Sequence, residues 1–354
     1  MTGSLMEILK FGVIEASAPC RIDLGGTLDI STFYYPLRYL SPSTFNIAID
    51  LRTSVKLLPF KKNVVKISSR GFESAEYPVD KAPFNHPLGL MFAIAAYFRA
   101  ENVHIIIDSS SPPRSALGGS SSAAVALVAA FSNAFKKTGG GSIAKDETAI
   151  LAHALEESVA GVPCGLQDQL AAAYGGINAW RWQREFNAPL FNKETILPVS
   201  EHESLNNHIL LAYCGMPHES KNINSRWVKD FLSGNNRDVW AEIIECTNRF
   251  AGLFKNKKFK EAAEVMNRET AIRVRMTPDV LDEMGKNLVN AAMENGCGAR
   301  FTGAGGGGCV WALGEADEIK RLGNIWRSIL ATLKDACLLD FGIDSKGLEV
   351  SGKI

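Results

Sequence analysis

The order of hydrophobic and polar positions predicts strands in the first half of the chain and mainly helices in the second. The polar, irregular stretch 183–205 separates the halves, so we expect one domain over residues 6–200 and another over residues 201–354. The predicted fold class is α+β in two domains. Strands are predicted at 13–24, 45–58, 63–68, 103–107, 208–213, 338–341 and 348–350, and helices at 86–100, 120–137, 146–160, 170–174, 222–232, 237–255, 259–276, 278–295 and 315–336.

A loop of small residues leads from a predicted strand into an apolar helix within the segment 110–137. Pro112 and Pro113 exclude helix before the loop, whereas Gly118 and Gly119 permit backbone geometries that a side chain would block. Unpaired N–H groups and the positive end of the helix dipole would converge near Ser120, where the helix begins. The pattern therefore predicts an anion site, most often for phosphate. The alternative is a serine-rich surface turn that only caps a core helix.

Composition narrows the class of protein. Of 354 residues, 46% are hydrophobic and 21% charged, which is ordinary for a globular chain. The 38 basic and 38 acidic residues balance, so nothing favours nucleic acid as a partner. The seven cysteines form no CxxC pair, and a reducing compartment fits them best. With no signal peptide or bilayer-spanning run, we expect a cytoplasmic protein without a membrane partner.

A second glycine-rich loop lies between two apolar strands near the C-terminus. Gly303, Gly305 and Gly308 match the GxGxxG pattern of dinucleotide-binding loops. However, the strand-like sequence CVWAL follows, where a dinucleotide site would need a helix. Close backbone approach to a ligand or to another loop explains these glycines better.

Several charged residues near these loops could carry chemistry, although each alone is more often an ordinary solvated group. Glu156 shares its helix face with alanines, which leaves room for a cation or phosphate. Glu157 follows it on the same helix. Asp168 lies in a glycine-bounded loop. Asp23 and Asp29 flank an early Gly–Gly turn, and Arg21 lies in the strand before it.

Four separated segments together resemble the GHMP kinases, the superfamily of galactokinase, homoserine kinase and mevalonate kinase. APCRIDLGGTLD at 18–29, PPRSALGGSSSAA at 112–124 and ARFTGAGGGGC at 299–309 are similar to its three motifs, in the same order. EESVAGVPCGLQDQ at 156–169 resembles its sugar-kinase segment. The resemblance implies a ribosomal-protein-S5-like first domain, a ferredoxin-like second domain, and ATP with Mg²⁺ as cofactors.

Roles for individual residues follow from this resemblance. Asp168 would be the catalytic aspartate, assisted by Arg21, which would favour its ionised form. Ser121 and Glu156 would hold Mg²⁺, with Glu157 as the alternative carboxylate. The expected substrate-binding residues are Asp29, Gly165, Gln167 and Asp168. The expected nucleotide-binding residues are Leu117, Gly118, Gly119, Ser120, Ser121, Ser122, Gly303, Gly305 and Gly306.

The sequence indicates the acceptor of the phosphoryl group less clearly than it indicates the family. LGGTLD is shorter than the galactokinase pattern and lacks its Glu and His, which argues against galactose. GLQDQLAAAYGGIN is similar to D-glycero-D-manno-heptose 7-phosphate kinases, so the best prediction is phosphorylation of that sugar phosphate at its anomeric hydroxyl. Its phosphate would need a cation. Candidates are Arg38, Arg181, Lys221 and Arg226.

Three other interpretations stay open at this stage. The chain could be a galactokinase, a fucokinase or another sugar kinase of the superfamily. It could be a non-catalytic sensor of sugar and nucleotide, although Ser121, Glu156 and Asp168 together favour an enzyme. An NAD-dependent oxidoreductase would rest on the Gly303 loop alone. The expected partner is a small sugar or sugar phosphate, and a homodimer is also compatible with the sequence.

Overall fold

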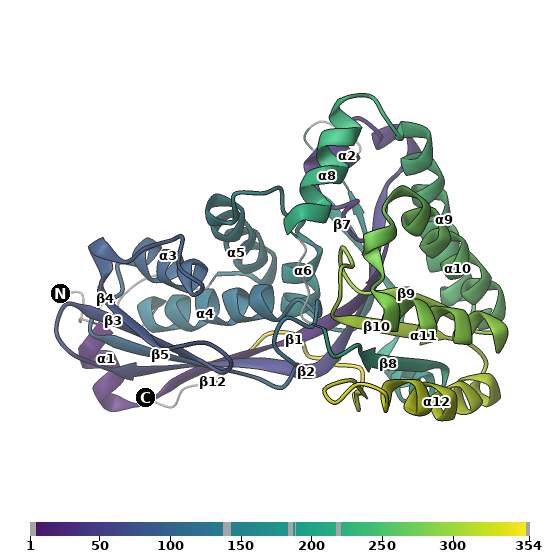
Figure 1. Ribbon diagram of the computed structural model, residues 1–354. Coiled ribbons are helices and arrows are strands. Elements are labelled where there is room, and N and C mark those ends of the chain that lie inside the picture. Colours follow the sequence, from purple (N-terminus) through teal and green to yellow (C-terminus); the bar gives the residue numbers. More distant parts are fainter. Residues whose placement is uncertain (1–4, 137–142, 183–186, 188, 217–220, 352–354) are drawn as a thin grey trace.

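The computed structural model describes residues 5–136, 143–182, 187, 189–216 and 221–351. It consists of two sheets, each with its own covering of helices (Figure 1). The α+β fold class predicted from the sequence is confirmed. The end of the helix predicted at 120–137 lies outside the described residues.

The larger sheet has eight strands and is mostly antiparallel. Its main order is β12-β1-β2-β5-β3-β4, and β6 joins it by pairing with both β2 and β7. Only β3 and β5 pair in parallel among its described ladders. Its strands are β1 (Ile14–Leu24), β2 (Ser43–Pro59), β3 (Val64–Ser69), β4 (Ala75–Pro78), β5 (Val103–Ser109), β6 (Ile177–Trp182), β7 (Phe191–Leu197) and β12 (Glu349–Ser351).

Four helices gather on one face of this sheet, with α4 lying along it beneath α3, α5 and α6 (Figure 1). Residues 123–135 of α4, which follow its glycine and serines, are largely apolar and buried, as a central helix requires. Helix α1, at the start of the described chain, packs against β2 and α4. The helices of this half are α1 (Leu5–Phe11), α2 (Ser31–Tyr34), α3 (Gly89–Tyr97), α4 (Gly119–Lys136), α5 (Lys145–Ala160) and α6 (Gln167–Tyr174), with 3₁₀ turns at Arg38–Leu40 and Val79–Lys81.

The smaller sheet has four antiparallel strands in the order β11-β8-β10-β9. Its strands are β8 (Ile209–Tyr213), β9 (Gly298–Phe301), β10 (Cys309–Leu313) and β11 (Cys337–Leu338). Helices of this half pack on it and on one another. They are α7 (His202–Leu205), α8 (Lys221–Leu232), α9 (Arg237–Lys255), α10 (Phe259–Met276), α11 (Glu283–Glu294) and α12 (Ala316–Leu330), with 3₁₀ turns at Val199–Glu201, Asn206–His208 and Pro278–Val280.

The two halves share strands and core. Strand β2 is 17 residues long, and its first part reaches toward the helices of the second half (Figure 1). One buried cluster runs from Ile22 on β1 through Phe45 on β2 to Trp311 on β10. At the other end of the chain, β12 returns to the first sheet and pairs with β1. The division at residue 200 stays a prediction.

The structure corrects several predicted elements. The stretch 183–205 is not irregular throughout, because β7 and α7 form within it. Asp168 lies in the first turn of α6, which begins at Gln167, and not in a loop. The helix predicted at 278–295 is divided into a 3₁₀ turn and α11, because Asp282 caps α11 by accepting a hydrogen bond from the Gly285 N–H.

Candidate active site

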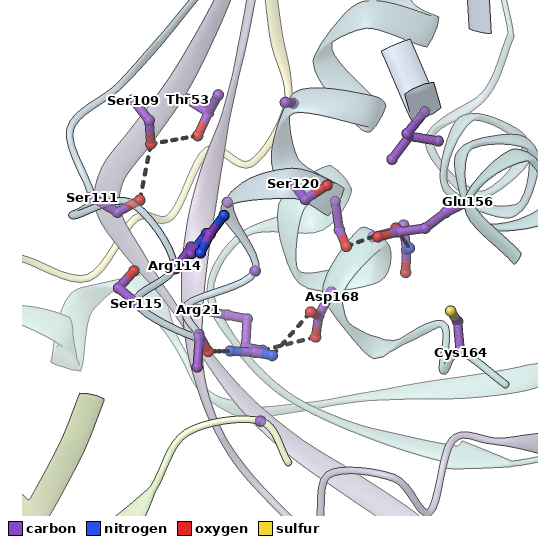
Figure 2. Close-up of a pocket in the computed structure, with 18 of the residues that line it drawn as sticks. Arg21, Thr53, Ser109, Ser111, Arg114, Ser115, Ser120, Glu156, Cys164 and Asp168 are labelled. Atoms are coloured by element: carbon purple, nitrogen blue, oxygen red, sulfur yellow. Dashed lines mark hydrogen bonds and ion pairs between the residues drawn. The ribbon is translucent and has the colours of Figure 1, made fainter. Parts of the chain in front are cut away.

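A cavity of about 390 Å³ opens where the small-residue loop, the end of α5 and the start of α6 meet. Figure 2 shows the loop on one side of it, with Arg21 and Asp168 at its floor and Glu156 beyond Ser120. Most of the predicted site residues line it, and they come from segments far apart in the chain. These are Arg21, Asp29, Gly118, Gly119, Ser120, Ser121, Glu156, Gly165, Gln167, Asp168 and Gly303.

The small-residue loop takes the backbone geometry that its glycine allows. Gly118 has φ +78°, and a Cβ there would lie 3.2 Å from Asp168 Oδ2. Helix α4 begins at Gly119, so the N–H groups of Gly119, Ser120 and Ser121 have no partner within the helix. These donors and the helix dipole form an anion site at the cavity wall.

Arg21 and Asp168 form a two-pronged ion pair at the cavity floor (Figure 2). Arg21 Nε donates to Asp168 Oδ1 at 2.8 Å and its Nη2 donates to Oδ2 at 2.9 Å. Arg21 Nη1 also donates to the carbonyl of Ala116 at 2.6 Å, which ties the pair to the loop. Burial raises the pKa of Asp168, whereas the charge and the hydrogen bonds of Arg21 lower it, as expected, without fully offsetting the burial.

The side chains of Ser121 and Glu156 are in direct contact at the cavity wall, which is compatible with the Mg²⁺ prediction. The Ser121 hydroxyl donates to Glu156 Oε2 at 2.8 Å, and Gln169 Nε2 donates to the same oxygen at 2.7 Å. Burial raises the pKa of Glu156 to about 7. Glu157 does not line this cavity, so the alternative carboxylate is not needed. A hydroxyl and a carboxylate are hard oxygen donors that suit Mg²⁺ with water and phosphate completing its shell.

Asp29 is held at the cavity wall by the start of α6. Its Oδ2 accepts a hydrogen bond from the Gln167 N–H at 2.9 Å, whereas its buried Oδ1 has no partner. Asn46 Nδ2 donates to Gln167 Oε1 at 2.9 Å, and this fixes the Gln167 side chain. Burial raises the pKa of Asp29 to about 7. Gly165 is required here, since a Cβ on it would lie 1.7 Å from Asp29 Oδ2.

The second glycine-rich loop braces the first. Gly303 has φ +61°, its N–H donates to Asp23 Oδ1 at 2.7 Å, and it lies beside Arg21 and Ala116. A Cβ on Gly308 would lie 2.6 Å from the carbonyl oxygen of Ser115. This close approach of two loops is what the strand–glycine–strand pattern predicted, and no dinucleotide-type helix follows the loop.

A buried ion network connects these loops to α10. Arg300 Nε donates to Glu269 Oε2 at 2.9 Å and its Nη1 contacts Asp23 Oδ2 at 3.3 Å. Arg273 Nε donates to Glu269 Oε1 at 2.9 Å, and its Nη2 donates to the Gly26 carbonyl at 2.8 Å. Arg300, Glu269 and Arg273 are fully buried and lie in the second half, whereas Asp23 and Gly26 belong to the early turn.

Some predicted residues do not line the cavity. Leu117 is buried beneath the loop, and its carbonyl accepts the Arg21 N–H at 3.0 Å. Ser122 is buried and its hydroxyl donates to the Pro19 carbonyl at 2.7 Å, so it shapes the loop from behind. Gly305 and Gly306 lie against Val280, and the Gly306 N–H donates to its carbonyl at 2.9 Å.

Three of the four candidate cations for an acceptor phosphate do not line this cavity. Arg181 pairs with Glu194 at 2.7 Å, and Arg226 pairs with Asp279 at 3.3 Å. Arg38 is exposed and does not line the cavity. The side chain of Lys221 lies outside what the structure describes.

Sequence reasoning missed one end of the cavity altogether. Two cations, Arg70 and Arg114, line it there together with hydroxyl groups on Thr53, Ser109 and Ser111. The three hydroxyls form a chain with contacts of 2.9 Å (Figure 2). Apolar side chains complete this end, and apart from Pro113 no local motif marked them, because β3, β5 and α3 bring them together. They are Phe72, Pro87, Leu88, Leu90, Met91, Ile107 and Pro113.

Comparison with known families matches both halves of the chain. Residues 85–176 match the family described as "GHMP kinases N terminal domain", and residues 250–332 match "GHMP kinases C terminal". The first match contains the small-residue loop, α5 and Asp168. The second contains Glu269, Arg273 and the glycine-rich loop.

Curated relatives are kinases of different substrates. The chain is 27% identical over 333 residues to the mevalonate kinase of Thermococcus sibiricus, a match covering 85% of this chain and 89% of that protein. It is 26% identical over 171 residues to probable glucuronokinase 2 of Arabidopsis thaliana, covering 47% of this chain. That second match spans only 46% of the relative's length.

Solved structures show the same fold over nearly the whole chain. Lactococcus lactis galactokinase complexed with galactose has a TM-score of 0.71 at 18% identity, with 95% of each chain covered. A D-glycero-D-manno-heptose 1-phosphate kinase from Bacteriodes thetaiotaomicron has a TM-score of 0.69 at 16% identity, covering 96% of this chain and 99% of that one. These TM-scores show the shared fold, whereas sequence identities this low leave the substrate undecided.

Proposed function

The chain belongs to the GHMP kinase family, whose two domains it carries in order, and we propose that it transfers the γ-phosphoryl group of ATP to a hydroxyl group of a sugar or sugar phosphate. The observation that carries this proposal is one cavity that joins the start of α4, the Ser121–Glu156 pair and the Arg21–Asp168 pair. An anion site, a metal site and a catalytic carboxylate are the parts that phosphoryl transfer requires.

The nucleotide would occupy the end of the cavity near Phe72 and Met91. These apolar side chains suit an adenine ring, and the Thr53–Ser109–Ser111 hydroxyls suit its polar edge or the ribose. The N–H groups of Gly119, Ser120 and Ser121 would then hold the phosphates. Arg114 lies on the same loop and would add positive charge there.

Ser121 and Glu156 would hold Mg²⁺ when the nucleotide is bound. The metal supplies neutralisation of charge on the phosphates during transfer. Gln169 orients Glu156 through its hydrogen bond. The buried Oε1 of Gln169 has no hydrogen-bond partner, so the oxygen atoms around the metal site are not all paired within the protein. Because burial raises the pKa of the Glu156 carboxyl to about 7, this group would lose its proton when the metal binds.

Asp168 would accept or orient the proton of the attacking hydroxyl. Arg21 holds it by two hydrogen bonds, which fixes the carboxylate within reach of the α4 N-terminus, where Gly118 lies close by. Arg21 would also neutralise charge that develops on the transferring phosphoryl group. Asp29 and Gln167 lie beside this pair and would bind other hydroxyl groups of the acceptor.

The acceptor proposed from the sequence, D-glycero-D-manno-heptose 7-phosphate, stays one candidate. Galactokinase, fucokinase or other sugar-kinase activity is the alternative, and a non-catalytic sensor is a second. Mevalonate belongs in any test because a mevalonate kinase matches most of the chain. All seven cysteines are free thiols, which is compatible with the cytoplasmic location expected from the sequence. Among described residues no helix is long and apolar enough to cross a membrane.

The proposal is tested by incubating the protein with MgATP and a panel of acceptors, and following products by ³¹P NMR. The panel contains neutral sugars, sugar 1- and 6-phosphates, the heptose 7-phosphate, glucuronate and mevalonate. We expect ADP and a new phosphate ester with one class of sugar, and no ester with mevalonate. A mevalonate ester, or nucleotide binding without any ester across the panel, would contradict a sugar kinase.

A further inference from the structure

A second cavity, of about 170 Å³, adjoins the first on the acceptor side. Asp29 and Cys164 line both cavities, so the two meet at these residues. Cys164 lies past Asp168 in Figure 2, away from the α4 end where nucleotide is proposed. The volume is several times the roughly 30 Å³ that one water occupies, so it can hold a short arm of a ligand.

Three buried polar atoms without a partner line this second cavity. They are Asp29 Oδ1, His153 Nδ1 and Trp182 Nε1. Asp29 is 5% exposed and Trp182 1% exposed, so leaving these atoms unpaired would be costly. A carboxylate oxygen accepts and an indole N–H donates, and one hydroxyl can do both. The cavity therefore has the donors and acceptors that hydroxyl groups satisfy.

Packing keeps these groups in place. Trp182, at the end of β6, stacks on Tyr34 of α2 with ring centroids 5.7 Å apart and an interplanar angle of 21°. His153 and Glu157 lie one turn apart on α5 and both line the cavity. The other carboxylate oxygen of Asp29, Oδ2, accepts a hydrogen bond from the Gln167 N–H, which fixes the side chain. The walls are thus built from β6, α2 and α5, with Asp29 held against the start of α6.

The charge of the second cavity selects against anions. Asp29 and Glu157 contribute two carboxylates, and none of the described residues that line it is Lys or Arg. A phosphate or carboxylate placed here would meet these acids with no compensating cation among the described residues of the wall. In contrast, a neutral hydroxyl-bearing group would meet matched partners.

We propose that the second cavity holds an uncharged, hydroxyl-bearing arm of the acceptor, and that Asp29, His153 and Trp182 select neutral sugars over sugars with a phosphate or carboxylate on that arm. This inference rests on the proposed kinase function and narrows its substrate class. It argues against a 7-phosphate on the acceptor. Trp182 and His153 then determine specificity and take no part in the chemistry.

The test compares acceptors that differ only in the arm. D-mannose is paired with D-mannose 6-phosphate, and D-galactose with D-galacturonate and with L-arabinose, which lacks the hydroxymethyl arm. Initial rates with MgATP and saturation-transfer NMR with a non-hydrolysable ATP analogue are both measured. We expect the neutral member of at least one pair to bind and react with a kcat/KM about 100-fold above its anionic partner, and the arabinose to be weaker than galactose by about tenfold.

Two variants separate specificity from structure. Trp182→Phe keeps the ring and removes the N–H donor, so we expect the KM for the neutral acceptor to rise about 3- to 10-fold while kcat and the KM for ATP stay unchanged. Trp326→Phe is the matched control, because Trp326 lies on α12 and its Nε1 donates to the Leu288 carbonyl. Glu157→Lys should shift the kcat/KM ratio toward the 6-phosphate by at least about tenfold.

The outcomes are distinguishable. Reaction of only the phosphorylated members, with no neutral sugar bound, overturns this inference and leaves a sugar-phosphate kinase in place. An unchanged acceptor KM in Trp182→Phe overturns it too, and means that the cavity holds only water. If no sugar of either kind binds or reacts, the proposed function fails and the inference fails with it.

Discussion

At the residue scale, the acceptor side of the site depends on a position without a side chain. Gly165 lies against Asp29 so closely that an added Cβ would come within 1.7 Å of Oδ2. That oxygen accepts the Gln167 N–H, and the neighbouring Asp168 is held by Arg21. A side chain at Gly165 would therefore displace Asp29, while the nucleotide end of the cavity would stay intact.

We predict that Gly165→Ala raises the KM for the acceptor at least about tenfold and leaves the affinity for ATP unchanged, because only one side of the cavity is distorted. Steady-state kinetics with each substrate varied in turn measures both values. Gly252→Ala is the matched control, since Gly252 lies on α9 with nothing within 4 Å of its added Cβ. Equal loss of both affinities would contradict the assignment of Asp29 to the acceptor.

The sequence predicted the residues of the site better than their surroundings. Arg21, Ser121, Glu156 and Asp168 were identified in short motifs, and the structure brings all four to one cavity. Trp182 and His153 could not be identified, because nothing local distinguishes them from ordinary core residues. Their unpaired atoms are recognised only when β6, α5 and α2 have packed together.

At the element scale, α10 holds the early Gly–Gly turn in place from the other half of the protein. Glu269 and Arg273 lie one turn apart on it and are fully buried. Arg273 lies 4.8 Å from the ring centroids of both Trp227 and Trp240, so its charge is enclosed by aromatic rings. Burial disfavours ionised Glu269, but its two arginines lower its pKa below the ordinary 4.5.

We predict that Glu269→Gln lowers the free energy of unfolding at pH 7 by about 3–5 kcal/mol, because it leaves two buried arginines without their shared partner. Denaturant unfolding measures this, with Glu264→Gln on the exposed face of the same helix as control. The native pKa of Glu269 is lowered, so its contribution is present above pH 4.5 and is lost as the pH falls through its folded value. The free energies of unfolding of the unsubstituted protein and of Glu269→Gln should therefore become equal in strongly acidic buffer. A difference that is the same at all pH values would contradict the ion network.

The elements themselves were predicted unevenly. Long periodic helices such as α9 and α10 were predicted with their observed bounds. The start of α6 was missed, because Gln167 and Asp168 carry no helical pattern and their helix is set by contacts with Asp29 and Arg21. Strand β7 was missed because its four consecutive polar residues, 192–195, show no alternation of apolar and polar positions; among the described strands it pairs with β6 alone.

At the scale of the whole molecule, the cavity lies where the two halves meet. The first half supplies the α4 loop, Glu156 and Asp168, and the second supplies Gly303 and Ala304. The Asp23–Arg300–Glu269–Arg273 network connects the halves behind Arg21. Charges of opposite sign alternate from Asp168 through Arg21 and Asp23 to α10, so the position of the second half bears on the proposed catalytic pair.

The measurement that tests the central claim most directly is phosphoryl transfer by Asp168→Asn, with the accepted sugar and with nucleotide binding measured in parallel. We predict that turnover falls by about 10²- to 10⁴-fold while ATP affinity stays within about threefold, because Asp168 acts on the acceptor hydroxyl and not on the nucleotide. Asp335→Asn, at an exposed position outside the cavity, should retain full turnover. Undiminished turnover in Asp168→Asn would contradict the account.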